Sequence, residues 1–203
     1  MKRFLALFVL IVASASAHAE APVILVFGDS ISAGYGLPLE QGWVELLRTR
    51  LKAQGYGYQV VNASVSGETT AGGLARLPRA LELHHPSIVI LELGGNDGLR
   101  GLPVAQMRTN LTQMISLSAA AGAKVLLLGM RMPPNYGPEY TKQFAMVFSD
   151  LASEKKISLV PFLLTDIALS PALLQADDIH PNAQGQPILL DNVWPTLKPL
   201  LHK

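Results

Sequence analysis

The sequence predicts an α/β fold in which helices cover both faces of a parallel sheet. Five short runs are rich in Val, Ile and Leu, and most are continuously apolar, as expected of parallel strands buried on both faces. Segments whose apolar residues recur with helical spacing separate these runs. Strand and helix therefore alternate along the chain, which favours three layers, with the sheet between two layers of helices.

The expected strands, in chain order, are residues 23–27, 58–62, 87–93, 124–129 and 158–162. The apolar helix faces lie within residues 43–51, 74–81, 104–115, 140–151 and 188–197. We interpret the aromatic and Met residues on these faces as core residues. Two irregular segments, residues 130–138 and about 163–185, are longer than a turn requires, and such segments often have a function. For residues 130–138, a connection stiffened by proline is an equally good interpretation.

The first 19 residues have the features of a secretory signal peptide. Lys2 and Arg3 precede an apolar run that ends near residue 15, and Ala17-His18-Ala19 forms an A-x-A cleavage site. The apolar run is too short to span a bilayer comfortably, so a retained anchor is the less favoured alternative. We therefore expect cleavage near Ala19, one domain over residues 20–203, and a periplasmic or secreted protein without a stable membrane anchor.

The composition excludes several classes of function. Cleavage after Ala19 removes two of the 16 Lys and Arg residues and leaves 14 against 15 Asp and Glu, so no basic stripe is available for nucleic acid. The chain has no cysteine, which excludes a thiol nucleophile, a Cys zinc site and a lipoprotein anchor. No dinucleotide fingerprint or Walker loop is present. We expect a monomer that needs no cofactor and binds no nucleic acid.

Ser30 is the candidate nucleophile. It lies in Gly28-Asp29-Ser30-Ile31-Ser32, directly after the first expected strand, and open α/β sheets place their chemistry where strands end. A serine in such a turn is more often a helix cap, so this stretch alone leaves both roles open. A serine hydroxyl becomes a nucleophile when a base, usually an imidazole oriented by a carboxylate, takes its proton.

His180 is the candidate base, because it follows the last expected strand and has carboxylates beside it. The other four histidines lie in the leader, near the C-terminus or at the end of an expected helix, where the helix dipole accounts for them. Asp177, three residues earlier, can reach the imidazole in a tight turn, whereas the geometry is harder for Asp178. A metal site at Asp177, Asp178 and His180 is a further alternative, although no clear third and fourth ligands are evident elsewhere.

Acyl transfer also needs hydrogen-bond donors for the developing oxyanion. The candidates are the backbone N–H of Ser30, the backbone N–H of Gly67 after the second strand, and the side-chain amide of Asn96 after the third. Taken singly, Gly67 is better explained as a turn glycine and Asn96 as a turn or cap residue.

Together these blocks resemble the SGNH (GDSL) hydrolase family. Gly28-Asp29-Ser30-Ile31-Ser32 is followed by Gly67, then by Gly94-Gly95-Asn96-Asp97, and then by Asp177 and His180-Pro181. Ile31 stands where the family name implies Leu, a change that keeps the side chain apolar and of the same volume. Residues 61–64, 74–78, 92–101 and 134–137 are similar to a branch of multifunctional bacterial thioesterases, lysophospholipases and arylesterases.

The resemblance implies the SGNH hydrolase fold, a three-layer α/β/α sandwich with a flavodoxin-like central sheet of about five parallel strands. It implies a serine esterase with Ser30 as nucleophile, His180 as base and Asp177 as its orienting acid. The oxyanion hole is then formed by Ser30, Gly67 and Asn96. The implied substrates are small molecules: aryl and fatty acyl esters, thioesters and lysophospholipids.

By the same resemblance, Leu99, Asn135 and Tyr136 are expected to border the acyl groove. A carbohydrate O-acetyl esterase is the alternative enzyme, although few aromatic residues outside the expected helices are available to stack on a sugar. A non-catalytic envelope binding protein is the alternative outside enzymes, and the intact set of four blocks argues against it.

Overall fold

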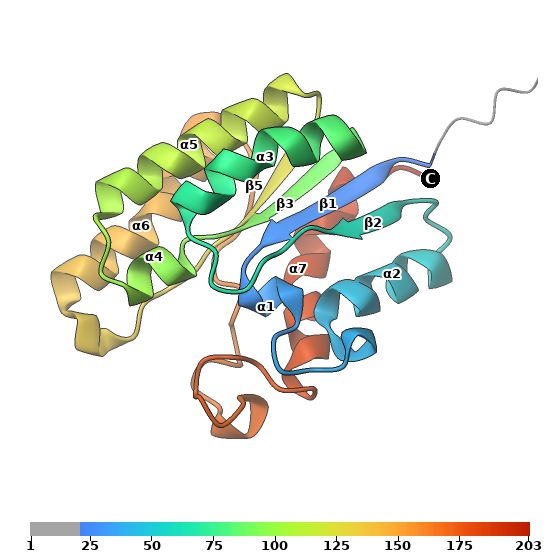
Figure 1. The fold of residues 1–203 in the computed structure, drawn as a ribbon. Coiled ribbons are helices and arrows are strands. Elements are labelled where there is room, and N and C mark those ends of the chain that lie inside the picture. The colour runs from blue at the N-terminus through green and yellow to red at the C-terminus, as the bar shows by residue number, and fades with distance from the viewer. Residues whose placement is uncertain (1–20) are drawn as a thin grey trace, which may run out of the picture.

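A five-stranded, all-parallel sheet forms the centre of the protein (Figure 1). The structure is a computed structural model that describes residues 21–203, so the expected leader lies outside the described residues. The strands are β1 (Val23–Gly28), β2 (Gln59–Asn62), β3 (Ile88–Glu92), β4 (Lys124–Leu128) and β5 (Ser158–Val160). Their spatial order, β2-β1-β3-β4-β5, is the flavodoxin-like order. The predicted fold class is confirmed.

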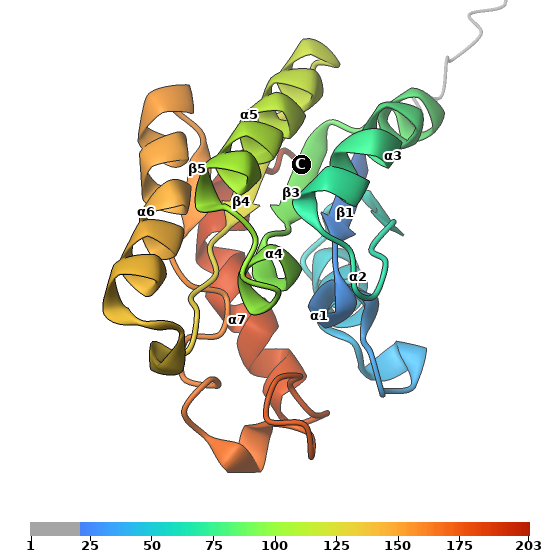
Figure 2. The ribbon, with the colours of Figure 1, turned by 60° about the vertical axis from the view of Figure 1, so that its left-hand side comes forward.

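Helices cover both faces of this sheet. One layer contains α3 (Thr70–His84), α5 (Val104–Ala120) and α6 (Pro138–Lys155), and the other contains α2 (Trp43–Ala53) and α7 (Gly185–Leu197) (Figures 1 and 2). The short helices are α1 (Ser30–Ala33), α4 (Gly95–Leu99), η1 (Leu39–Gln41), η2 (Pro134–Tyr136), η3 (Pro171–Leu173) and η4 (Lys198–Leu200). No helix within residues 21–203 combines the length and apolar character needed to cross a membrane.

The expected strands form where the sequence predicts them, with small differences at their ends. The strand expected at 158–162 ends at Val160 because proline follows it, and the chain then leaves the sheet. The helix expected at 188–197 begins earlier, at Gly185. Pro187 lies in its first turn, where a missing N–H costs no hydrogen bond, so this proline does not delay the helix.

The core is built on the strands. Ile24, Leu25, Val26 and Phe27 of β1 have no exposed surface, which accounts for the absence of polar alternation in the sequence. Parallel strands place their carboxyl ends at one edge of the sheet. Consequently the segments after β1, β2 and β3 meet there, together with the irregular segment after β5 (Figures 1 and 2).

Candidate active site

The chain turns sharply into α1 immediately after β1, and Ser30 is the first residue of this short helix. Asp29 is the N-cap, and its Oδ1 accepts a hydrogen bond of 3.1 Å from the Ile31 N–H. Gly34 ends the helix in the left-handed conformation, with φ of 73°. The Ser30 side chain is thereby held at the carboxyl edge of the sheet.

His180 lies between Ser30 and Asp177. Its Nε2 is 2.7 Å from Ser30 Oγ, and its Nδ1 is 2.6 Å from Asp177 Oδ2. With the proton on Nδ1, the ring donates to Asp177 and accepts from the Ser30 hydroxyl. This is the arrangement in which an imidazole can take the proton of a serine that attacks a carbonyl.

A hairpin-like turn after η3 determines which carboxylate reaches His180. Leu174 and Pro181 form an antiparallel bridge, which closes the turn. Asp177 Oδ1 accepts from the backbone N–H of Ile179 and of His180, each at 3.0 Å, so this carboxylate points toward the ring. Asp178 takes the left-handed conformation, with φ of 56°, and the ring bonds Asp177 instead.

The Asp177 carboxylate is stabilised in its charged form. Partial burial alone raises its pKa, but hydrogen bonds from the backbone and ring of His180 and from the Ile179 N–H outweigh this effect and lower the pKa to about 2. Asp177 is therefore ionised throughout the neutral range, as an acid that stabilises an imidazolium must be.

Two of the three expected oxyanion donors are free. Within residues 21–203, the N–H groups of Ser30 and Gly67 have no hydrogen-bond acceptor. Gly67 has a φ of 77°, which favours glycine, and Arg100 Nη2 donates to the Gly67 carbonyl at 2.9 Å. Both N–H groups therefore remain available to an incoming oxygen.

The third expected donor, the Asn96 amide, already has two acceptors. Its Nδ2 donates to the Glu68 carbonyl at 3.0 Å and to Asp29 Oδ2 at 3.1 Å. These bonds fix the side chain beside the Ser30 turn. To bind an oxyanion, the amide has to share or exchange one of them.

Asp29 and Glu92 form a buried acidic pair beneath the turn. Glu92 is fully buried and Asp29 is 2% exposed. Burial raises the pKa of Asp29 to about 6. The hydrogen bond from the Ile31 N–H, a positive charge on His180, and the hydrogen bonds with Glu92 and Asn96 each lower this pKa and so limit the rise. Burial and the negative charge of Asp29 raise the pKa of Glu92 well above its usual range.

Three further residues lie at the site, although the sequence did not predict a role there for any of them: Glu92, Tyr35 and Gln175. Glu92 had a detectable signal, because it is an ionisable residue at the end of an otherwise apolar run. Tyr35 packs against the His180 ring, with centroids 4.7 Å apart. Gln175 Nε2 donates to the carbonyls of Tyr35 and Pro181, and its backbone N–H donates to the His180 carbonyl. Nothing local in the sequence marks these two contacts.

The residues expected at the groove come from two segments that meet. The Tyr136 hydroxyl of η2 donates to the Leu99 carbonyl at the end of α4, at 3.0 Å. Asn135 is an exposed neighbour in η2. Leu99 of α4 and Tyr136 of η2 are therefore in contact, and α4 lies beside α1, the helix that begins with Ser30 (Figure 2).

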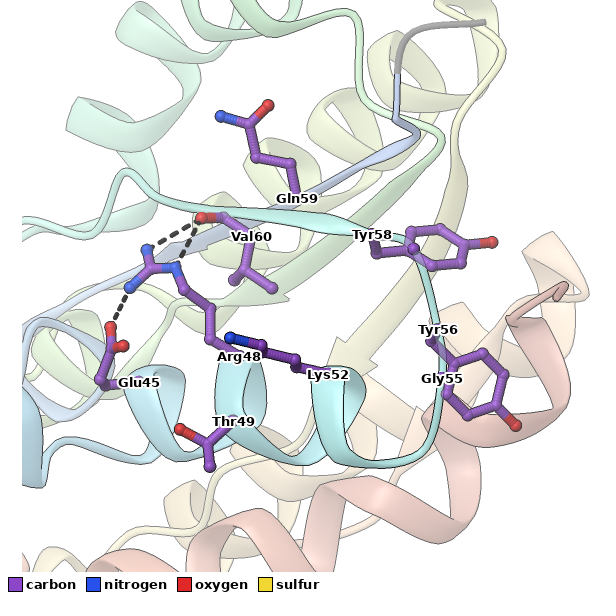
Figure 3. Close-up of a pocket in the computed structure, with 10 residues that line it drawn as sticks. Glu45, Arg48, Thr49, Lys52, Gly55, Tyr56, Tyr58, Gln59 and Val60 are labelled. Atoms are coloured by element: carbon purple, nitrogen blue, oxygen red, sulfur yellow. Dashed lines mark hydrogen bonds and ion pairs between the residues drawn. The ribbon is translucent and has the colours of Figure 1, made fainter. Parts of the chain in front are cut away.

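A separate hollow lies away from these residues. An open depression of about 790 Å³ lies between α2 and β2 and contains none of the expected site residues (Figure 3). Arg48, one of the residues that line it, donates to the Val60 carbonyl and pairs with Glu45. Within residues 21–203, no three His, Cys, Asp or Glu side chains are grouped so as to hold a metal ion.

Known proteins share both this sequence and this fold. The chain matches the GDSL-like lipase/acylhydrolase family over residues 26–188. It is 55% identical to the esterase TesA of Pseudomonas aeruginosa, across 91% of this chain and 92% of that protein. It is 41% identical to the Escherichia coli protein named thioesterase 1/protease 1/lysophospholipase L1, across 91% and 87% respectively. A crystal structure of the psychrotrophic esterase EstA from Pseudoalteromonas, inhibited by monoethylphosphonate, matches with a TM-score of 0.84 and 44% identity, across 87% of this chain and 97% of that one.

Proposed function

The chain belongs to the GDSL-like lipase/acylhydrolase family and is a carboxylic ester hydrolase, and we propose that Ser30, His180 and Asp177 carry out its reaction. The observation that carries this assignment is the pair of short hydrogen bonds on the His180 ring, 2.7 Å to Ser30 Oγ and 2.6 Å to Asp177 Oδ2. A histidine placed in the core for packing has no need of both partners.

In the first half of the reaction, Ser30 Oγ attacks the ester carbonyl while His180 Nε2 takes the hydroxyl proton. The negative charge of Asp177 stabilises the imidazolium and keeps the ring oriented. The tetrahedral intermediate collapses to an acyl-enzyme on Ser30, and His180 gives its proton to the leaving alcohol. In the second half, His180 activates a water molecule in the same way, and the acid is released.

The backbone N–H groups of Ser30 and Gly67 donate to the oxyanion in this proposal, and the absence of another acceptor for either group within residues 21–203 supports this assignment. Asn96 is the third donor in this proposal. Its amide is held beside the turn by Asp29 and Glu68 and turns one N–H toward the oxyanion as charge develops.

We assign aryl and fatty acyl esters as substrates, together with thioesters and lysophospholipids. Relatives named for esterase, thioesterase and lysophospholipase activities support this range. The contact between Tyr136 and Leu99 supports a groove between α4 and η2 for the acyl chain, with Asn135 at its rim. The expected leader supports a periplasmic or secreted location, and we assign the protein as a monomer without a membrane anchor.

A phosphonate tests the assignment of the nucleophile directly. Incubation with a p-nitrophenyl alkylphosphonate is expected to stop ester hydrolysis and to add one phosphonyl group to the peptide that contains Ser30, as measured by mass spectrometry. Covalent labelling of another serine, with equal loss of activity, would refute the assignment.

A further inference from the structure

Glu92 lies directly beneath the turn that carries Ser30. It is the last residue of β3 and has no exposed surface. Its Oε2 accepts two hydrogen bonds, from the Asp29 N–H at 3.1 Å and from Ser32 Oγ at 2.8 Å. A Cβ at Gly28 would lie only 2.5 Å from the same oxygen, so the backbone of the turn packs closely against this carboxyl.

Asp29 extends this contact to the expected oxyanion hole. Its backbone N–H binds Glu92, its Oδ1 caps the helix that begins with Ser30, and its Oδ2 accepts from Asn96 Nδ2. A displacement of Glu92 is therefore transmitted to the nucleophile turn and, through Asp29, to the Asn96 amide.

The second oxygen of Glu92 indicates how the pair is protonated. Oε1 is buried and has no hydrogen-bond partner within residues 21–203. Two ionised carboxylates packed together in the interior repel each other, and protonation of one of them removes this repulsion. Hydrogen bonding by Glu92 lowers the pKa of Asp29, whereas the charge of Asp29 raises the pKa of Glu92. Glu92, which is fully buried and has an oxygen without a hydrogen-bond donor, therefore holds the proton, and Asp29, which accepts hydrogen bonds from Ile31 and Asn96, is the charged member at neutral pH.

Few other groups act on this pair. From the segment after β5, a positive charge on the His180 ring, as forms during the proposed reaction, favours the ionised form of Asp29. From α1 and α4, the neutral side chains of Ser32 and Asn96 donate to Glu92 and Asp29 respectively. No arginine or lysine pairs with either carboxylate within residues 21–203.

We propose that Glu92 is a positioning residue, a buried neutral acid that holds the Ser30 turn and, through the Asp29 carboxylate, the Asn96 amide in the geometry of catalysis. This inference rests on the proposed role of Ser30 as nucleophile. Glu92 itself touches no substrate.

The test compares Glu92→Gln with Glu92→Ala in the full-length mature protein. Glutamine has the shape and the neutral charge of protonated glutamic acid, and its carbonyl can accept from the Asp29 N–H and the Ser32 hydroxyl as Glu92 Oε2 does. Glu92→Gln is expected to keep kcat for p-nitrophenyl butyrate within about threefold. Glu92→Ala is expected to lower kcat by about 10- to 100-fold while KM changes less than threefold, because acyl binding is not altered. Ser118→Ala, which removes a buried hydroxyl bonded to the Met114 carbonyl in α5, is the matched control and keeps kcat.

Thermal unfolding gives a second measurement that does not depend on activity or on the folding of Glu92→Ala. Glu92 stays protonated in the folded protein but ionises in the unfolded chain above its usual pKa of 4.5, so the wild type loses stability as pH rises through this region. The glutamine in Glu92→Gln does not ionise, so this variant does not lose stability in this way. The Tm of Glu92→Gln relative to the wild type is therefore expected to rise by at least about 3 °C between pH 5 and pH 8.

The outcomes separate this inference from the proposed function. A Tm difference that is flat or falls with pH, a kcat for Glu92→Gln as low as that of Glu92→Ala, or a wild-type kcat in Glu92→Ala would each overturn it. Phosphonate labelling of wild-type Ser30 is measured alongside. If Ser30 is not labelled, the proposed function fails, whatever the Glu92 variants show.

Discussion

The ring of Tyr35 packs against the ring of His180, with centroids 4.7 Å apart and planes tilted by 41°. The two residues are 145 positions apart in the chain. Gln175 joins their segments, because its Nε2 donates to the Tyr35 carbonyl at 2.8 Å and to the Pro181 carbonyl at 3.2 Å. His180, the proposed base, is thus in contact with both an aromatic ring and the Asp177 carboxylate.

Replacing Tyr35 tests this support. An aromatic ring beside an imidazole stabilises the imidazolium that forms in the transition state, by about 0.5–1 kcal/mol at a half-exposed position. Tyr35→Ala is expected to lower kcat by about two- to fivefold, whereas Tyr35→Phe, which keeps the ring, stays within about twofold. Steady-state kinetics on p-nitrophenyl esters measure both. Equal losses in the two variants would show that the hydroxyl, rather than the ring, is what matters.

Asp177 and Asp178 provide a matched pair for the acid of the triad. Asp177→Asn is expected to lower kcat by about 10⁴-fold, because an amide at this position leaves the imidazole in the wrong tautomer. Asp178→Asn is expected to change kcat by less than about threefold, since the ring bonds Asp177. The reverse order would transfer the orienting role to Asp178.

The pKa of Asp177 also predicts how stability depends on pH. Because the folded pKa of about 2 lies below the ordinary value of 3.8, the folded protein releases this proton more readily than the unfolded chain. The stabilisation of the folded protein by the ionised Asp177 carboxylate is therefore complete above about pH 4 and is lost as pH falls toward 2. The Tm advantage of the wild type over Asp177→Asn should shrink over this interval in a thermal-unfolding series. An advantage that grows on acidification would contradict the assigned hydrogen bonds.

Asn96→Ala tests the third oxyanion donor. Removal of one donor to a developing oxyanion lowers kcat by about 10²- to 10³-fold in comparable sites. KM is expected to change little, because the interaction is strongest in the transition state. Asn110→Ala, which removes another amide that bonds a neighbouring side chain, is a suitable control for structural loss. If both variants lose kcat equally, Asn96 is only a structural residue.

The contact between Tyr136 and Leu99 predicts that replacing Tyr136 changes the enzyme's preference for substrates of different acyl chain length. Tyr136→Ala is expected to lower kcat/KM for p-nitrophenyl decanoate by about fivefold more than for the acetate, because a long acyl chain loses more apolar contact. The ratio of the two kcat/KM values is the measurement. An unchanged ratio would remove residues 99 and 136 from the acyl groove. A carbohydrate O-acetyl esterase would hydrolyse the acetate best in every variant.

Much of the fold could be predicted because its signals are local. The strands are recognisable because burial on both faces requires continuous apolar runs, and β1 meets this requirement fully. Ser30, Gly67 and Asn96 could be singled out because each follows a strand, and parallel strands bring such positions to one edge. α7 begins at Gly185, three residues before the expected start, with Pro187 in its first turn.

What the sequence does not reveal depends on contacts between distant segments. The Tyr35 contact requires Gln175 to join two loops. The importance of Glu92 emerges only when β1 and β3 pair and place its carboxyl beneath Gly28. None of these relationships has a fixed spacing in the chain.

The most direct measurement is the kcat of Ser30→Ala on a p-nitrophenyl ester, with Tm measured to show that the variant is folded. We expect a loss of about 10⁴-fold or more, since removal of the nucleophile leaves only the oxyanion donors and substrate binding. Substantial activity in a folded Ser30→Ala protein would contradict the central claim that Ser30 forms the acyl-enzyme.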